Sequence, residues 1–488
     1  MDRIKRRTLL WLAGTAVVLL AVYQLSCLAK YRMGFPLDDA WIHQTFARNL
    51  ARFGAWSYLP PQPSAGSTAP LWTLLLAPGQ LAGINPVLWS GLLNGLLLVL
   101  IGYFLQDLWD RSVNDAHKIA LPLIGLLIVS EWHLLWAALS GMETLFYILI
   151  IVLMARDLMT VTPKWFRLGL LTGLLAWVRP DGMTLLGPVF FLAVLKNADA
   201  KSRARAGLQA AAGFILLFLP YLGFNYCVEG TLLPNTYFAK QTEYAVMRNT
   251  PLPGRWVKMF FQLLVGIGLP LLPGFVYRVF KAIRERDWWG IAMILWVLGY
   301  VSLYAFRLPV VYQHARYLMP TMPLYYYLGF EGMVAILNKP DPLSITALLK
   351  KVWIVTLAVT ALAFMFLGAR AFADDVAIIE SELVDASKWV AENTPADALV
   401  AAHDIGALGY YGKRSILDLA GLIDPEVIPF MRDEQALMRY MRANDVDYLF
   451  TFPGWYPEIV QQAQQVYSTN NPYSPAAGGE NMQIFRFR

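Results

Sequence analysis

The segment Pro36–Gln44 (PLDDAWIHQ) follows the first hydrophobic stretch of the chain and carries two adjacent carboxylates, Asp38 and Asp39. From Ile42 to Phe53, apolar side chains recur at the spacing of a helix and polar ones fill the gaps. A helix with one polar and one apolar face is typical of a segment that lies in the plane of a membrane surface. Asp is also a good helix N-cap, so the acidic pair is either a cap alone or a cap beside a functional site.

The composition is that of a membrane protein. Of 488 residues, 57% are hydrophobic and only 15% are charged, which is too little charge for a soluble chain of this length. Residues 371–488 hold 8 Lys and Arg against 17 Asp and Glu, whereas residues 1–370 hold 32 against 17. A basic membrane domain (1–370) and an acidic soluble domain (371–488) are therefore predicted. Because the positive charge lies in membrane loops, we expect no nucleic-acid partner.

Hydrophobic stretches of about 20 residues, enough to cross the hydrocarbon core, recur along the first domain. We predict eleven spans, at about 8–29, 86–107, 119–138, 144–160, 167–178, 182–196, 207–226, 258–278, 288–306, 318–337 and 352–370. Lys and Arg cluster in alternate loops, which is the positive-inside pattern. We therefore expect a cytoplasmic N-terminus, a first outer loop at about 30–70, and an extracytoplasmic C-terminal domain.

The tail has the pattern of a small α/β domain. Strands are predicted at 398–402, 415–419, 448–452 and 482–487, and helices near 376–393, 433–443 and 456–467. It contains no Gly-rich phosphate loop, no Cys and His cluster with metal-ligand spacing, and no nucleophile elbow. The fold class expected is thus a polytopic α-helical membrane protein with an extracytoplasmic α/β tail, and the tail is not expected to carry the chemistry.

Polar side chains gather at the predicted outer ends of the spans, on the same side as Asp38 and Asp39. They are Glu143, Arg179, Asp181, Asn235, Lys240, His314 and Arg316. An ionised group near the bilayer centre costs about 2.5–3.5 kcal/mol on an insertion scale, so such groups tend to be paired or functional. Nearer the interface the cost is smaller, and snorkelling is the structural alternative. Carboxylates beside several cations suit a substrate that carries a phosphate and a lipid tail.

Several short motifs follow one another in order across about residues 1–330. They are Asp38–Ile42 (DDAWI), Arg48–Leu50 (RNL), Ser67–Thr73 (STAPLWT), Gly141–Thr144 (GMET), Trp177–Pro180 (WVRP) and Gly230–Thr236 (GTLLPNT), with Ala239 and Lys240 after the last. This ordered set resembles the GT-C superfamily of integral membrane glycosyltransferases, and most closely the arabinofuranosyltransferases that cap cell-wall arabinan. The resemblance implies an enzyme of a bacterial-type inner (plasma) membrane that uses a polyprenyl-phosphate-linked sugar and a glycan or glycolipid acceptor.

The resemblance assigns catalysis to the first acidic residue of the opening motif. Asp38 is therefore the predicted general base, which takes a proton from the acceptor hydroxyl as the anomeric carbon inverts. If Asp39 caps the helix, its carboxylate is occupied by a backbone N–H and Asp38 stays free. The polar residues at the outer span ends are predicted to bind the donor phosphate and substrate.

Three alternatives remain open at this stage: a metal site at the acidic pair, a transporter, and a non-catalytic assembly or receptor protein that acts through its tail. The acidic pair, Asp38 and Asp39, could instead or also hold a divalent cation, and oxygen ligands alone would suit Mg²⁺, Mn²⁺ or Ca²⁺. The protein could also be a lipid or glycan transporter or flippase, which would be expected to show internal repeats and broken or charged helices near the bilayer midplane. Charges concentrated at the outer ends favour the transferase.

Overall fold

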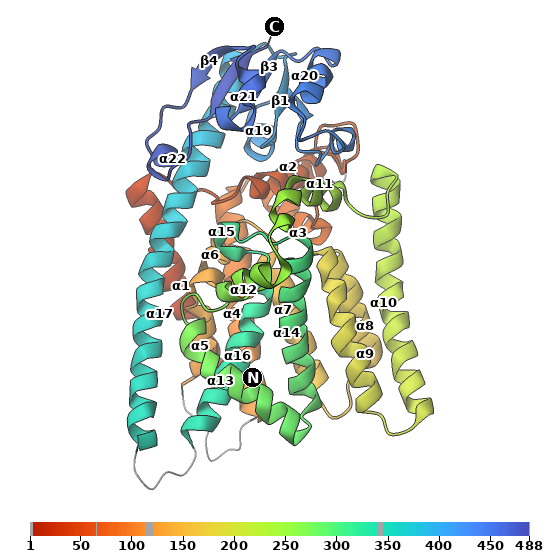
Figure 1. The fold of residues 1–488 in the computed structure, drawn as a ribbon, viewed down its shortest axis with the longest axis vertical. Helices are drawn as coiled ribbons and strands as arrows, with labels where there is room; N and C mark the ends of the chain where they lie inside the picture. Colours follow the sequence, from red (N-terminus) through yellow and green to blue (C-terminus); the bar gives the residue numbers. More distant parts are fainter. Residues whose placement is uncertain (1–2, 65, 113–120, 339–344, 488) are drawn as a thin grey trace.

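The computed structural model describes residues 3–64, 66–112, 121–338 and 345–487, and shows a long helical bundle with a small sheet domain at one end (Figure 1). Five helices in this part of the chain are long and apolar enough to cross a membrane. They are Lys5–Lys30, Pro86–Ser112, Ala200–Glu229, Trp288–Arg307 and Ala347–Asn393. Their large apolar side chains are widely exposed, as on Val355 (59%) and Phe366 (60%), which suits lipid rather than water as the surrounding solvent.

Most predicted spans coincide with single helices. These are α1 (Arg3–Lys30), α4 (Pro86–Ser112), α7 (Thr144–Met159), α8 (Trp165–Ala176), α9 (Leu186–Leu195), α10 (Ala200–Glu229), α14 (Trp288–Arg307), α16 (Met322–Leu337) and α17 (Ile345–Ile378). The polytopic helical class is confirmed, and the number of crossings stays a prediction.

Two predicted spans are wrong as single helices. Of 119–138, the first residues lie outside the described chain and the rest forms α5 (Leu123–Val129) and α6 (Trp132–Leu139). The break occurs because the Glu131 carboxylate caps α6, accepting from the N–H of Leu134 at 3.0 Å. The stretch 258–278 is likewise divided between α12 (Leu252–Gln262) and α13 (Gly268–Glu285).

The predicted orientation can be tested with fusions. The connection between α9 and α10 lies at the end of the bundle away from the sheet domain (Figure 1). We expect reporters fused after Lys201 and at the C-terminus to report opposite sides of the membrane, because basic loops stay in the cytoplasm. Alkaline phosphatase and green fluorescent protein fusions measure this directly. The same side for both fusions would contradict the topology.

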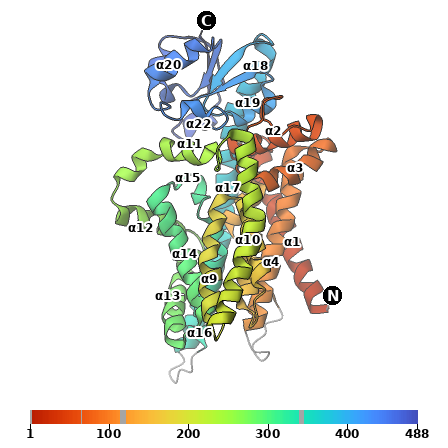
Figure 2. The same ribbon diagram turned by 90° about the vertical axis from the view of Figure 1, so that its right-hand side faces the viewer.

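Helices α2 (Asp38–Phe53), α3 (Pro70–Leu81) and α11 (Asn235–Glu243) lie between the bundle and the sheet domain (Figures 1 and 2). The helix predicted from the apolar spacing is therefore confirmed as α2. The prediction that the polar face of α2 contacts water is wrong, however, because His43 and Gln44 are only 3% and 1% exposed. His43 pairs with the Ser67 hydroxyl, and Gln44 accepts from Gln80 of α3, so protein groups replace water on that face.

The tail contains a five-stranded sheet of order β2-β1-β3-β5-β4 in the described residues, with β2, β1 and β3 parallel and β5 antiparallel to both its neighbours. The strands are β1 (Leu399–Ala402), β2 (Ser415–Asp418), β3 (Tyr448–Thr451), β4 (Gln464–Ser468) and β5 (Gln483–Arg486). The four predicted strands and the helix α20 (Glu434–Ala443) are confirmed. The helix predicted at 456–467 is wrong, because only the short α21 (Pro457–Val460) forms and β4 occupies the rest.

The bundle and the tail are joined without a linker. Helix α17 passes through the predicted boundary at 370/371 and continues through a π-helical turn, Ile379–Val384, into α18 (Asp385–Asn393). The whole run, Ala347–Asn393, is one helix of 47 residues. The tail is therefore attached to the end of a long helix that also packs against the bundle.

Candidate functional site

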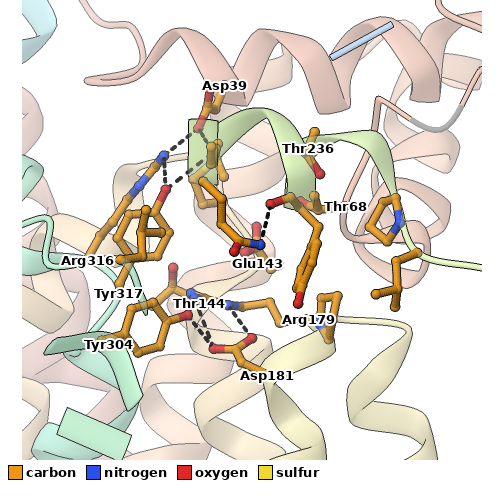
Figure 3. A pocket seen from close by; sticks show the side chains of 18 of the residues that line it. Asp39, Thr68, Glu143, Thr144, Arg179, Asp181, Thr236, Tyr304, Arg316 and Tyr317 are labelled. Atoms are coloured by element: carbon orange, nitrogen blue, oxygen red, sulfur yellow. Dashed lines mark hydrogen bonds and ion pairs between the residues drawn. The ribbon is translucent and has the colours of Figure 1, made fainter. Parts of the chain in front are cut away.

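A cavity of about 410 Å³ lies beneath the tail, where α2, α7, α11 and the end of α14 meet (Figure 3). Its charged lining residues are Asp39, Glu143, Arg179, Asp181, Lys240, Arg307 and Arg316. Most of the other lining residues are apolar or aromatic, and the tail contributes Leu422. Since four of the charged groups are cations and three are carboxylates, the cavity is suited to an anionic ligand with an apolar part.

Asp39 binds two cations at the top of this cavity (Figure 3). Its Oδ2 accepts from Nη2 of Arg316 at 2.5 Å and lies 3.3 Å from Nζ of Lys240. The Tyr317 hydroxyl accepts from both cations, at 3.2 Å and 3.3 Å. Burial alone would raise the pKa of the Asp39 carboxyl, but Lys240 and Arg316 outweigh it and hold that pKa well below its usual range. Asp39 is therefore ionised at neutral pH.

Asp38 does not line the cavity. Its two oxygens accept from the backbone N–H groups of Gly406 at 2.6 Å and Ala407 at 2.7 Å, where α19 (Gly406–Tyr411) begins in the tail. A Cβ at Gly406 would lie 2.1 Å from the carbonyl oxygen of Asp38, so this close approach requires glycine.

This geometry corrects the roles predicted for the acidic pair. Asp38 fastens the tail to α2, and Asp39 is the carboxylate that faces the cavity. The capping hypothesis is also wrong: in the described chain α2 starts at Asp38 with Leu37 as its N-cap, and no side chain there makes a capping bond. Asp39 is held by side chains from other elements rather than by its own helix.

Arg179 and Asp181 form a closed pair on the opposite side of the cavity (Figure 3). Nε and Nη2 of Arg179 donate to the two oxygens of Asp181, both at 3.2 Å. Tyr304 donates to Asp181 at 2.7 Å and accepts from Arg179 at 2.9 Å. Both residues line the cavity, and their role in binding the donor stays a prediction, but a bidentate pair leaves little free charge for a phosphate. Arg316 and Lys240 are better placed for that role.

Glu143 lies in the cavity next to a histidine. Nε2 of His43 is 3.7 Å from Oε2 of Glu143, and its Nδ1 pairs with the Ser67 hydroxyl at 3.0 Å. Burial lowers the pKa of His43 more than the Glu143 carboxylate raises it, so the imidazole is neutral at pH 7. The Oε2 atom of Glu143 is buried and has no hydrogen-bond partner among the described residues. It is available to a hydroxyl of a ligand.

Two predicted site residues point elsewhere. Nδ2 of Asn235 donates to Glu229 at 2.7 Å, back toward the end of α10. Nε2 of His314 lies 2.8 Å from Oδ2 of Asp375 on α17. Neither residue lines the cavity, because a neighbouring carboxylate holds each side chain.

Polar groups in the cavity wall also lack partners. Nε and Nη1 of Arg316 and Oγ1 of Thr236 are buried and make no hydrogen bond within the part of the chain that the structure describes. Leaving a buried polar group unsatisfied costs about 1–3 kcal/mol, and more for a charged one. Buried N–H groups without partners on a cation indicate a binding site for an anion.

Sequence reasoning overlooked several lining residues. They are Ile42, His43, Thr68, Thr144, Thr236, Tyr304, Arg307 and Tyr317. His43 could have been found, because it lies four residues after Asp39 and so shares its face of a helix. Tyr304 carries no such signal, since an aromatic residue inside an apolar span indicates packing.

The tail is fastened to α2 at both ends of α19. Besides the Asp38 contacts, Arg48 donates to the carbonyl oxygens of Tyr410 at 2.6 Å and Gly409 at 3.1 Å, and Tyr58 donates to the carbonyl of Ile405. Asp404 is half-buried at this junction.

Burial raises the pKa of Asp404 to about 6, the His403 imidazole opposes the rise, and the Asp39 and Glu243 carboxylates add to it. A raised carboxyl pKa favours the folded state only while the group is protonated. That contribution is complete below the unfolded value of about 3.9 and is lost as pH rises through about 6.

Asp404→Asn should therefore stabilise the protein at pH 7.5 by about 1–3 kcal/mol, since one pKa unit corresponds to about 1.4 kcal/mol. At pH 4.5 we expect a smaller gain, because the wild-type carboxyl is then largely protonated. Thermal unfolding in detergent at both pH values measures the difference. Asp397→Asn, an exposed tail position, is the matched control. An equal change at both pH values would contradict this.

The acidic pair does not fit a divalent cation. Asp38 and Asp39 take different partners, and among the residues that the structure describes no group of three or more His, Cys, Asp or Glu could hold a metal ion. Asp39 already contacts Arg316 and Lys240, whose charges would repel a metal. A phosphate matches these cations better.

Comparisons with known proteins bear on the tail and on the fold separately. Residues 376–485 match a family described as a domain of unknown function (DUF8728). No curated protein matches the sequence. The whole chain is similar to ArnT from Cupriavidus metallidurans bound to undecaprenyl phosphate, at 12% identity and a TM-score of 0.62, over 98% of each chain.

Two archaeal structures show the same likeness. The oligosaccharyltransferase of Archaeoglobus fulgidus in the apo form has 12% identity and a TM-score of 0.62, over 92% of this chain and 69% of that one. AglB from the same organism, in complex with an inhibitory peptide and a dolichol-phosphate, has 13% identity and a TM-score of 0.58, over 91% and 69%. At this level of identity the likeness shows that this chain shares the fold of these structures.

Proposed function

We propose that this protein is a membrane glycosyltransferase that moves a sugar from a polyprenyl-phosphate donor to a glycan or glycolipid acceptor outside the cytoplasm. The observation that carries the proposal is the cavity in which the ionised Asp39 contacts both Arg316 and Lys240. Two N–H groups of Arg316 there have no partner among the residues that the structure describes. The fold supports it, because similar structures hold undecaprenyl phosphate and dolichol-phosphate.

The donor phosphate would accept hydrogen bonds from the free N–H groups of Arg316 and from Lys240. A guanidinium offers a planar edge of donors that matches a phosphate, and both cations stabilise the negative charge that grows on the leaving group. The prenyl chain would follow the apolar lining of the cavity, to which Leu303 and Leu308 at the end of α14 and Leu233 contribute. No acid is needed to help the phosphate leave.

In the chemical step, the acceptor hydroxyl attacks the anomeric carbon and forms the new glycosidic bond. The bond from that carbon to the phosphate oxygen breaks, and its electron pair leaves with polyprenyl phosphate. The hydroxyl proton passes to the carboxylate of Asp39, and the anomeric configuration inverts. Glu143, whose Oε2 accepts no hydrogen bond from any described residue, would accept from another hydroxyl of the substrate.

Donor binding would also make Asp39 a stronger base. In the free protein its pKa is low because Lys240 and Arg316 are paired with it. A bound phosphate competes for the same two cations and weakens their effect on the carboxylate. Basicity would thus rise when the donor is in place and a proton has to be taken.

Sugar identity and cellular location are the finer parts of the proposal. The ordered motifs of the sequence suggest arabinofuranose as the sugar, a role in building a cell-envelope glycan, and a bacterial-type inner membrane as the site of action. The tail, above the cavity, would contact the acceptor. Surface-glycan analysis of a deletion strain would identify the sugar and linkage.

The activity is tested with the purified full chain in detergent and a radiolabelled polyprenyl-phosphate sugar, arabinofuranose first. We expect polyprenyl phosphate to be released and the sugar to pass to a glycan acceptor, or slowly to water if no acceptor is added. A flippase would instead move intact donor across proteoliposomes without consuming it. If the protein leaves the donor intact for every polyprenyl-phosphate-linked sugar in a panel, the proposal is overturned.

A further inference from the structure

Three consecutive residues have left-handed backbone although none is glycine. Gln313, His314 and Ala315 have φ of 53°, 55° and 54°. Each Cβ makes this conformation unfavourable, so a run of three is unusual. Such strain persists only where the surroundings impose it, and it gathers at functional sites.

His314 is held from two sides. Its Nε2 lies 2.8 Å from Oδ2 of Asp375 on α17, and Nε1 of Trp136 donates to that same oxygen at 2.9 Å. The imidazole packs edge-on against the rings of Trp132 and Trp136, with centroids 5.1 Å and 5.3 Å away. Ala315 beside it is fully buried. The turn is thus fixed by α6 and α17 rather than by its own sequence.

Arg316 follows the turn directly. Its backbone N–H donates to the carbonyl oxygen of Gln313 at 3.2 Å, so the turn sets where its side chain begins. That side chain reaches Asp39 at 2.5 Å, and its Nε and Nη1 have no hydrogen-bond partner within the described chain. A right-handed backbone at the three preceding residues would send Arg316 in another direction.

We propose that His314, anchored by Asp375, is a positioning residue that maintains this left-handed turn and thereby aims Arg316 at the donor phosphate. The inference rests on the proposed function in one respect, the identity of the ligand as a lipid phosphate. It gives His314 a role different from the direct ligation that the sequence predicted. Because Asp375 belongs to the helix that carries the tail, the same pair connects the tail's support to the phosphate-binding group.

The test is a double-mutant cycle on binding of undecaprenyl phosphate to the full chain in detergent. His314→Ala should raise Kd at least about tenfold, the scale of one charge-assisted hydrogen bond. In an Arg316→Ala background, the same substitution should change Kd by less than about twofold, because residues that act as a unit are not additive. Additive effects, or normal binding by His314→Ala, would overturn the role.

Two variants separate positioning from general damage. His314→Asn retains an N–H donor and tolerates left-handed backbone, so we expect it to bind within about threefold of the wild type. Gln313→Ala, which shortens an exposed side chain in the same turn, should bind normally. A Kd for His314→Asn as poor as that for His314→Ala would argue against a positional role.

A readout without ligand keeps the two proposals distinguishable. If the wild type does not bind undecaprenyl phosphate, the proposed function fails. The four proteins of the cycle can then be compared by thermal unfolding, where coupling between His314 and Arg316 should persist. Independent effects on the unfolding temperature would overturn the positioning role alone.

Discussion

Asp39→Asn should lower the turnover of a polyprenyl-phosphate sugar by at least about 100-fold, the usual contribution of a general base. The substitution preserves shape and removes basicity. It also releases Arg316 and Lys240 from their only shared carboxylate in the described chain, so undecaprenyl phosphate should bind as well as before or more tightly. Single-turnover rates and equilibrium binding, measured on the same preparation, separate the two effects.

Asp38→Asn is the matched control. An amide keeps one acceptor oxygen and loses the other, so one of the two bonds to the start of α19 is broken. We expect a lower unfolding temperature and a smaller loss of turnover than for Asp39→Asn. Near-normal transfer by a folded Asp39→Asn protein would end the assignment, and Glu143 would be the next base to test.

Arg316→Ala should raise the Kd for undecaprenyl phosphate about 10- to 150-fold, because a hydrogen bond to a charged group contributes about 1.5–3 kcal/mol. The Kd of Arg316→Lys should lie between those of the wild type and Arg316→Ala, because an ammonium keeps the charge but lacks the planar set of donors. Titration of the lipid phosphate at two salt concentrations measures both variants.

Arg307→Ala serves as the comparison for that loss. Arg307 also lines the cavity, but its guanidinium lies over the Tyr237 ring at 3.9 Å. Removing it should change Kd by no more than about threefold, in line with a partly exposed cation. If Arg316→Ala and the wild type bound the lipid phosphate equally, Arg316 would be a structural partner of Asp39 only.

Much of the architecture follows from short-range pattern. Spans such as α10 and α14 could be predicted because apolar composition over a sufficient length defines a membrane helix. The joint location of Asp39 and Lys240, 201 residues apart, could be predicted as well. The predicted topology places both residues at the same membrane surface, where opposite charges attract.

The different roles of Asp38 and Asp39 could not be predicted from the sequence. Asp38 is occupied by the backbone N–H of Gly406, 368 residues later, and no local pattern records that contact. The sequence also could not predict that the His314 side chain points away from the cavity, for a related reason. Left-handed backbone at Gln313 and His314 is imposed by packing and by Asp375, whereas sequence signals of such backbone come mainly from glycine and asparagine.

The unbroken helix Ala347–Asn393 has a mechanical consequence. Hinged domains move about flexible linkers, but a continuous helix offers no such pivot. Its π-helical turn is also clamped, because Arg32 binds Glu380 at 2.7 Å and Met482 donates to Glu382 at 2.8 Å. The tail is thus expected to keep a fixed position relative to the helical bundle. Under the proposed function, acceptors would be selected by whether they fit between the tail and the cavity.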